Sequence, residues 1–234
     1  MLYIPKIFHH IWLGNAPLPE KFSLWLSQWE EMNPGWTVMR WTDQNLPEIT
    51  NRKEFDEADR MAKKSDILRY EVCLQYGGVY IDADFEPLKP IEPILDGVHA
   101  FIADEHPGIP CNALIGCEAG QPFFKVLVDR LPESIRHGME TGGDIVEQTG
   151  PKFLKRCLDE YEGNDQVPVP SDAPGVLGRR VEIRSSDGTK SVHLFEYSVF
   201  YPYYYTEPEK EDTVFPEAFG KHHWTASWWK NGGI

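Results

Sequence analysis

The chain has little of what marks several classes of protein. Its 234 residues contain four cysteines and no CxxC pair, which argues against a disulfide scaffold and favours a reducing compartment. No stretch approaches the length of apolar sequence that spans a bilayer. The first residues lack the charged region and apolar run of a secretion signal. We therefore expect a cytoplasmic protein with no transmembrane segment.

Positive charge is also scarce. The chain has 23 Lys and Arg against 37 Asp and Glu, for a formal net charge of −14, and no run of Lys and Arg stands out. Such a surface repels phosphate backbones and anionic headgroups, so nucleic acid is not expected as a partner. An acidic protein that binds an anionic diphosphate needs a local counter-charge, and a bound cation would supply it.

The length and the aromatic content indicate a folded protein with one substantial core. A chain of 234 residues suits a single domain, over 1–234. Eight Trp, ten Tyr and twelve Phe are many for this length. They serve either a generous core or flat platforms for sugar or base rings, and the sequence leaves both interpretations open.

Hydrophobic spacing predicts an α/β fold. Residues 4–13 form a buried strand, and a helix follows from Pro17–Glu20 with an apolar stripe of Phe22, Trp25, Leu26 and Trp29. Residues 36–41 alternate as a second strand. A strand, a helix and a strand in this order imply a parallel crossover with helices on the faces of the sheet.

The rest of the chain continues the pattern. A helix is expected over about 57–76, ended by Gly77-Gly78, and the short strand 79–81 leads directly into Asp82. The proline-rich segment that follows is expected to be irregular. Further strands are expected at 99–103, 112–116, 181–184 and 192–197, further helices at 123–130 and from Pro151 to about 161, and a flexible loop at 162–178.

The strongest chemical signal is Asp82-Ala83-Asp84. Carboxylates two residues apart at the end of a strand point the same way, because side chains alternate along a strand. Two converging acids stay ionised cheaply only with a cation between them. Mg²⁺ or Mn²⁺ would bind there and coordinate a diphosphate, at the strand ends where ligands of α/β sheets bind. The alternative is a pair of surface acids at a turn.

Asp66 and Arg69 lie three residues apart on the preceding helix and share a face. One interpretation is an ordinary ion pair within the helix. The other is that Asp66 accepts hydrogen bonds from sugar hydroxyls while Arg69 contacts the sugar or a phosphate oxygen.

Three blocks of sequence, in this order, carry a resemblance to a known family: IPKIFHHIWLG at 4–14, KSDILRY at 64–70 and YGGVYIDAD at 76–84. Asn112-Ala113, Thr149-Gly150-Pro151 and the ending with His222-His223-Trp224 extend it. The chain resembles the DxD sugar transferases, a group with bacterial capsular-polysaccharide transferases, the yeast initiating α-1,6-mannosyltransferase and, more distantly, the large clostridial glucosylating toxins. The resemblance implies a GT-A fold, with a Rossmann-like central mixed sheet flanked by helices.

The resemblance also implies roles in binding a nucleotide-sugar donor. Trp12 would stack on the nucleotide base, with a place in the core as the alternative, and Tyr80 would lie against the base or ribose. Asp66 and Arg69 would grip the donor sugar, and Asn112 would face it. Asp66 and Arg69, with Asp84, are the predicted catalytic residues.

The metal ligands are implied in the same way. Asp82 would contact the metal or the ribose, and Asp84 would bind the metal directly. His222 would be the third ligand, with His223 as its competitor, because neighbours on a strand face opposite ways.

Two more segments have weaker assignments. Trp228 would cap the donor from a mobile C-terminal flap, residues 220–234. Thr149-Gly150-Pro151 is typical of a helix start with the threonine as cap.

The function expected from this resemblance is a metal-dependent glycosyltransferase using Mn²⁺ or Mg²⁺. It would move a sugar from a UDP- or GDP-sugar to a glycan, glycolipid or protein acceptor, with retention of configuration. One alternative is an aspartate-nucleophile phosphohydrolase, but Glu86 stands where those enzymes typically have Thr or Val. Another is a non-catalytic sugar-binding module, suggested by the aromatic run at 200–205.

Overall fold

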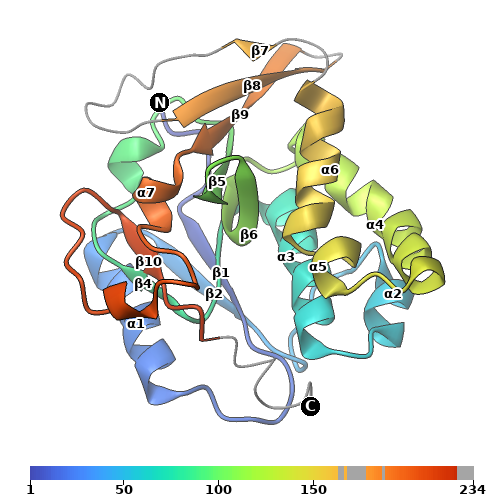
Figure 1. The fold of residues 1–234 in the computed structure, drawn as a ribbon, viewed down its shortest axis with the longest axis horizontal. Helices are drawn as coiled ribbons and strands as arrows, with labels where there is room; N and C mark the ends of the chain where they lie inside the picture. The colour runs from blue at the N-terminus through green and yellow to red at the C-terminus, as the bar shows by residue number, and fades with distance from the viewer. Residues whose placement is uncertain (163–165, 168–177, 186–187, 226–234) are drawn as a thin grey trace.

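A computed structural model describes residues 1–162, 166–167, 178–185 and 188–225 (Figure 1). In these ranges the main element is an eight-stranded mixed sheet with the order β2-β1-β3-β6-β5-β9-β8-β7. Its strands are β1 (Ile7–Ile11), β2 (Thr37–Trp41), β3 (Gly78–Ile81), β5 (Ala100–His106), β6 (Ile109–Cys117), β7 (Gln166–Val167), β8 (Gly178–Ser185) and β9 (Gly188–Phe195).

The predicted crossover at the start of the chain is confirmed. β1 and β2 pair in parallel, with Ile7 opposite Thr37 and Ile11 opposite Trp41. Helix α1 (Glu20–Met32) connects them, and its buried residues are the four of the predicted stripe. β1 also pairs in parallel with β3, which places the strand that leads into Asp82 in the middle of the sheet.

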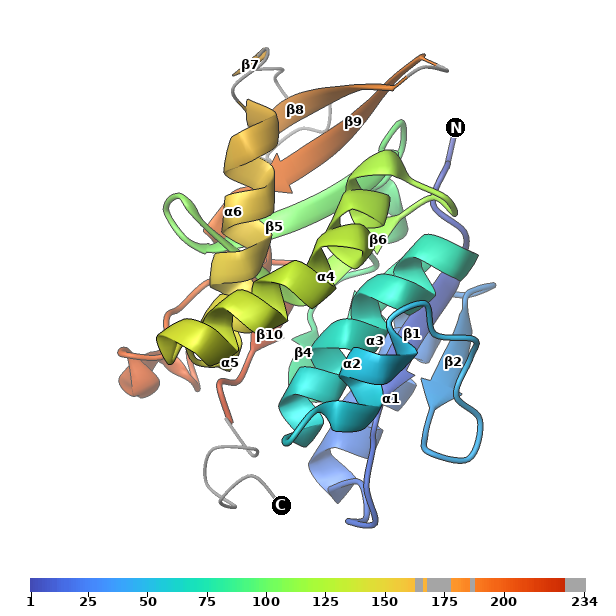
Figure 2. The same cartoon turned by 90° about the vertical axis from the view of Figure 1, so that its right-hand side faces the viewer.

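Helices cover both faces of the sheet (Figures 1 and 2). Alternate residues of β3 enter different cores: Tyr80 joins one cluster of buried side chains, whereas Val79 and Ile81 join the other. The first cluster lies under α3 (Met61–Tyr76), α4 (Pro122–Thr141) and α6 (Pro151–Glu162), and the second lies under α1 and α7 (Tyr197–Phe200). Short helices complete the set, namely α2 (Arg52–Glu57), α5 (Ile145–Gln148), η1 (Glu92–Ile94) and η2 (Pro208–Lys210).

The helix expected over 57–76 begins later than predicted. α2 ends at Glu57, and Ala58 is extended with φ −64° and ψ 126°, so the chain breaks before α3 begins at Met61. The predicted end is right, because Gly77 follows Tyr76 with φ +65°. The helix predicted over 123–130 is too short: α4 reaches Thr141 because Leu131, Ile135 and Gly138 continue its buried face.

The segment after Asp84 is more regular than expected. Phe85–Pro87 forms β4, which pairs antiparallel with β10 (Gly220–His222) in a separate two-stranded sheet, with His222 opposite Phe85. This pairing joins the chain's end to the residues next to Asp84. Of the predicted flap, Gly220 to Thr225 is therefore packed, and 226–234 lies outside the described residues.

Two other expectations fall partly outside the described ranges. Of the loop predicted at 162–178, the structure describes the end of α6, the short strand β7 and the first residue of β8. Across the described ranges, no helix combines the length and the apolar composition needed to cross a membrane.

Candidate functional site

The two aspartates lie in a turn between β3 and β4. The Asp82 amide donates to the Ala113 carbonyl on β6 at 2.8 Å, and the Phe85 amide donates back to the Asp82 carbonyl at 3.2 Å. Both acids therefore lie beyond the end of β3, so the alternation of side chains along a strand does not set their directions. They converge because the chain turns, and the turn is tied to β6 on one side and β10 on the other.

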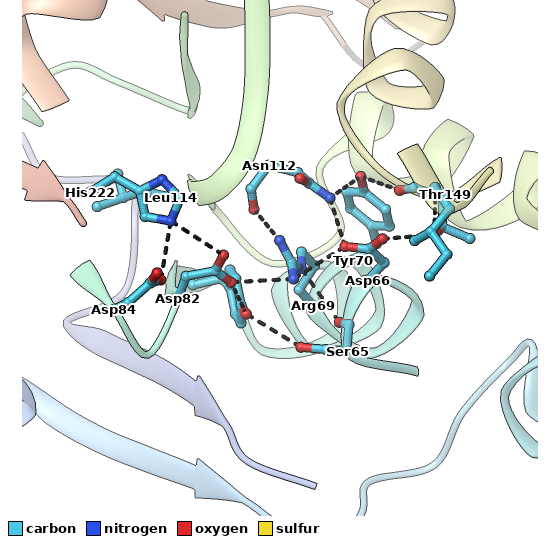
Figure 3. A network of polar contacts seen from close by, with 12 residues as sticks. Ser65, Asp66, Arg69, Tyr70, Asp82, Asp84, Asn112, Leu114, Thr149 and His222 are labelled. Carbon is cyan, nitrogen blue, oxygen red and sulfur yellow. Dashed lines mark hydrogen bonds and ion pairs between the residues drawn. The ribbon is translucent and has the colours of Figure 1, made fainter. Parts of the chain in front are cut away.

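A cluster of three potential metal ligands forms at this turn (Figure 3). The His222 Nε2 atom lies 3.1 Å from an Asp84 oxygen and 3.9 Å from an Asp82 oxygen. One ligand atom from each of the three residues lies within 4.8 Å of the others. Thr225 supports the cluster, since its amide and its hydroxyl donate to the second Asp84 oxygen at 2.9 and 2.8 Å.

The charges of this cluster are strongly coupled. Burial disfavours the charged form of Asp84, but His222 and Thr225 more than offset it and hold the pKa of Asp84 below its usual range. Burial opposes protonation of His222, yet Asp84 raises its pKa above the ordinary value. Burial raises the pKa of Asp82 despite Arg69. The positive charge of protonated His222 is thus stabilised by the carboxylates of both Asp84 and Asp82.

Arg69 is the cationic centre of the neighbouring network. Its guanidinium lies 3.1 Å from Asp66 and 3.2 Å from Asp82 and donates to the Asn112 carbonyl at 2.8 Å. It also lies over the Tyr80 ring, 4.4 Å from the centroid. The side chains of Arg69 and Asp66 are only 7% and 9% exposed. The ion pair within the helix is therefore present, but it is buried and forms part of a larger network.

Asp66 is held from several directions (Figure 3). It accepts from the Asn112 amide at 3.0 Å and from the Thr149 hydroxyl at 2.7 Å. The Tyr70 hydroxyl donates to the Thr149 carbonyl at 2.9 Å and accepts from Asn112 at 3.0 Å. Burial raises the pKa of Asp66 even though Arg69 lowers it. The network fixes the carboxylate in one orientation beside the metal-ligand cluster.

The two candidate histidines face opposite sides, as expected. His222 faces Asp84, whereas His223 lies 2.7 Å from Glu86, 3.0 Å from Glu211 and stacks on Trp25 at 4.2 Å. Only His222 therefore takes part in the described three-residue cluster.

The predicted base-binding aromatics have different environments. Tyr80 is 2% exposed, and its hydroxyl donates to Asp82. Trp12 is half-buried; its indole donates to the Ala16 carbonyl at 2.7 Å and meets Phe22 edge-on at 6.1 Å. The assignment of Trp228 lies outside the described residues.

Three residues of the site were missed or misjudged from the sequence. Thr149 follows α5 and donates to Asp66 rather than capping the next helix. Tyr70 could have been found, because it follows Asp66 by four residues on one helix face. No local pattern points to Thr225, since its bond to Asp84 joins residues 141 positions apart.

Comparison with known proteins agrees with this geometry. Residues 19–100 match the family model for the glycosyltransferase sugar-binding region containing a DXD motif. The chain is similar to the DXD glycosyltransferases. The chain is 27% identical over 157 residues to "Inositol phosphoceramide mannosyltransferase 3" of Schizosaccharomyces pombe, and the match covers 64% of this chain and 44% of that protein. It is 20% identical to the "Initiation-specific alpha-1,6-mannosyltransferase" of Candida albicans, covering 97% and 73%.

Solved structures confirm the predicted GT-A-type fold. The PaToxG glycosyltransferase matches with a TM-score of 0.54 at 17% identity, over 67% of this chain and 69% of that one. The ligand-free glycosyltransferase domain of the YGT toxin matches with a TM-score of 0.52 at 12% identity, over 70% and 78%. The predicted resemblance and the predicted fold are thus confirmed. The chain spans about half the length of the curated relatives it matches first.

Proposed function

We propose that the protein is a metal-dependent glycosyltransferase that uses a nucleotide-sugar donor. The observation that supports this most directly is the convergence of Asp82, Asp84 and His222 within 4.8 Å beside the buried Arg69 network. Two carboxylates and an imidazole on one side of a bound ion leave room for diphosphate oxygens on the other.

The donor atoms suit a divalent transition metal. Carboxylates bind Mg²⁺ and Mn²⁺ alike, but an imidazole ligand favours Mn²⁺, because Mg²⁺ prefers oxygen. We assign the metal to Asp84 and His222, with Asp82 as a ligand directly or through water. When bound, the ion would neutralise the charge that develops on the departing nucleoside diphosphate.

The residues around the metal would bind the rest of the donor. Arg69 lies 3.2 Å from Asp82, and its charge suits a phosphate or sugar oxygen. Asp66 and Asn112 would face the donor sugar, oriented by their mutual hydrogen bond. Trp12 and Tyr80 are proposed for the base and ribose of a UDP- or GDP-sugar, and Trp228 for a cap over it.

The acceptor is proposed from the relatives. The fungal proteins are named as mannosyltransferases that act on inositol phosphoceramide or initiate α-1,6-mannosylation. A glycan or glycolipid acceptor is consistent with both, and a protein acceptor is the remaining candidate. The proposed retention of configuration and role in polysaccharide synthesis rest on the resemblance alone. The cytoplasmic location is supported by four free, buried cysteines.

A thermal-shift screen tests the donor proposal. UDP and GDP are added with and without Mn²⁺, because a ligand that binds the native state raises the melting temperature. We expect one nucleotide to stabilise the protein only with metal, and its sugar conjugates to be hydrolysed slowly without acceptor. If neither nucleotide shifts the melting temperature with Mn²⁺ or Mg²⁺, and no donor is consumed, the proposal fails.

A further inference from the structure

The aromatic run at 200–205 divides into two parts with different roles. Phe200 and Tyr201 are fully buried, and Tyr203 is 4% exposed, so these side chains belong to the core. Tyr204 is half-buried and Tyr205 is 58% exposed. The inner part therefore belongs to the core, whereas Tyr205 presents most of its surface to solvent.

Tyr204, Tyr205 and Trp224 form a continuous group, which we call the aromatic platform. The two tyrosine rings lie 4.3 Å apart, and both meet the Trp224 ring edge-on, at 5.6 and 6.0 Å. Trp224 in turn lies 4.3 Å from the ring of His222. The platform thus begins at the metal-ligand cluster and extends outward from it to the exposed ring of Tyr205.

The backbone at Trp224 is unusual. With φ +49° it is the one non-glycine residue in the left-handed region among the described parts of the chain. Flanking bonds hold this conformation: the indole donates to the Tyr203 carbonyl at 3.2 Å, and the Thr225 amide donates to Asp84 at 2.9 Å. Strain of this kind persists where the surroundings impose it, and it is concentrated at functional sites.

A carboxyl group accompanies the platform. Glu105 lies at an irregularity in the pairing of β5 with β6, between Asp104 and His106. It directly precedes His106, whose ring lies 5.2 Å from the ring of Tyr204. Burial raises the pKa of Glu105. It can accept a hydrogen bond from a hydroxyl of a ligand that rests on the tyrosines.

We propose that the aromatic platform binds the acceptor as a neutral pyranose ring, with one apolar face against Tyr205 and Tyr204 and a hydroxyl toward Glu105. Pyranose rings combine an apolar face with hydrogen-bonding edges, which suits flat aromatic side chains beside a carboxyl. The Tyr204 amide donates to the Glu207 carboxylate at 3.1 Å, and this negative charge beside the platform disfavours a phosphorylated or carboxylated ring. The inference rests on the proposed function, because an acceptor on the platform would lie next to the proposed metal site.

Ligand-observed NMR on the full chain tests this without catalysis. Methyl glucoside, galactoside and mannoside are mixed with the protein in the absence of metal, and saturation transfer to their ring protons is measured. We expect transfer from at least one glycoside, weaker binding of glucose 6-phosphate, and loss of about tenfold in affinity in Tyr205→Ala. Tyr205→Phe should retain most of the affinity, because it keeps the aromatic face.

The control is Tyr197→Ala, which removes another exposed tyrosine, 40% exposed and outside the platform. It should bind the glycosides as wild type does. Four results would each overturn the proposal. They are equal losses in both alanine variants, no binding of any methyl glycoside by wild type, binding of octyl glucoside only, and a preference for glucose 6-phosphate. The nucleotide screen without glycoside is independent: if it succeeds while the glycosides fail, the platform proposal is wrong and the donor proposal stands.

Discussion

Replacing Arg69 with leucine should destabilise the protein far more than the loss of an ordinary ion pair. Arg69 lies within 3.2 Å of two carboxylates, and its own side chain is 7% exposed. Breaking a buried pair from one side leaves an uncompensated charge and costs about 3–5 kcal/mol. For a chain of this size, the melting temperature should fall by roughly 10 °C.

The size of this loss of stability depends on how deeply each of the two carboxylates is buried. Asp66 is 9% exposed and carries most of the expected penalty, whereas Asp82 is 25% exposed and regains water more easily. Removing the more buried charge should therefore restore part of the loss. We expect Arg69→Leu combined with Asp66→Asn to be more stable than Arg69→Leu alone, although each single change is destabilising.

Urea unfolding followed by tryptophan fluorescence measures these differences. Arg52→Leu is the control, because the Arg52–Asp56 pair spans 2.8 Å but is 59% and 52% exposed. Such an exposed, solvent-screened pair contributes little to stability. If Arg69→Leu unfolds within about 1 kcal/mol of that control, or if Asp66→Asn adds its full cost in the double variant, Arg69 is not the shared counter-charge.

Three further results are expected. Asp84→Ala should abolish Mn²⁺-dependent stabilisation by nucleotide in thermal-shift measurements; unchanged stabilisation would contradict the metal assignment. Gly78→Ala should cost roughly 3 kcal/mol or more in urea unfolding, because a Cβ would lie 2.6 Å from the Ile7 carbonyl, while Gly97→Ala, at a similar positive φ but in open space, should cost less. Burial lowers the pKa of His9 to about 4, so the folded state binds fewer protons than the unfolded state between pH 6.5 and 4. Wild type should therefore lose stability as pH falls through that range, and His9→Gln should flatten the loss in pH-dependent melts.

Local patterns in the sequence predicted much of the fold around the site. The stripe of α1, the parallel crossover and the glycine end of α3 depend on residues close together in the chain. The same is true of the strand that leads into Asp82. These features follow from periodicity and from the backbone freedom of Gly77, so sequence alone was enough to locate Asp82 and Asp84 at the carboxyl end of a central strand.

The parts that failed depend on contacts between distant residues. The spacing of Asp66 and Arg69 predicts their ion pair but not its burial, which contacts with β6 and with the turn at Thr149 produce. The pairing of β4 with β10 joins Phe85 to His222 across most of the chain. The prolines after Asp84 predicted irregular structure for Phe85–Pro87. Nothing in the local sequence reveals that this segment pairs with a distant strand.

The position of His222 depends on residues that face away from the metal-ligand cluster. Lys221 and His223 flank it on β10, and both lie against Glu86, at 3.0 and 2.7 Å. A slip of β10 by one residue would exchange the two faces of the strand, since side chains alternate. It would bring His223 toward Asp84 and remove both contacts with Glu86. The ion pairs on the far face therefore oppose that slip, and the register they stabilise is what presents His222, rather than His223, to the two aspartates.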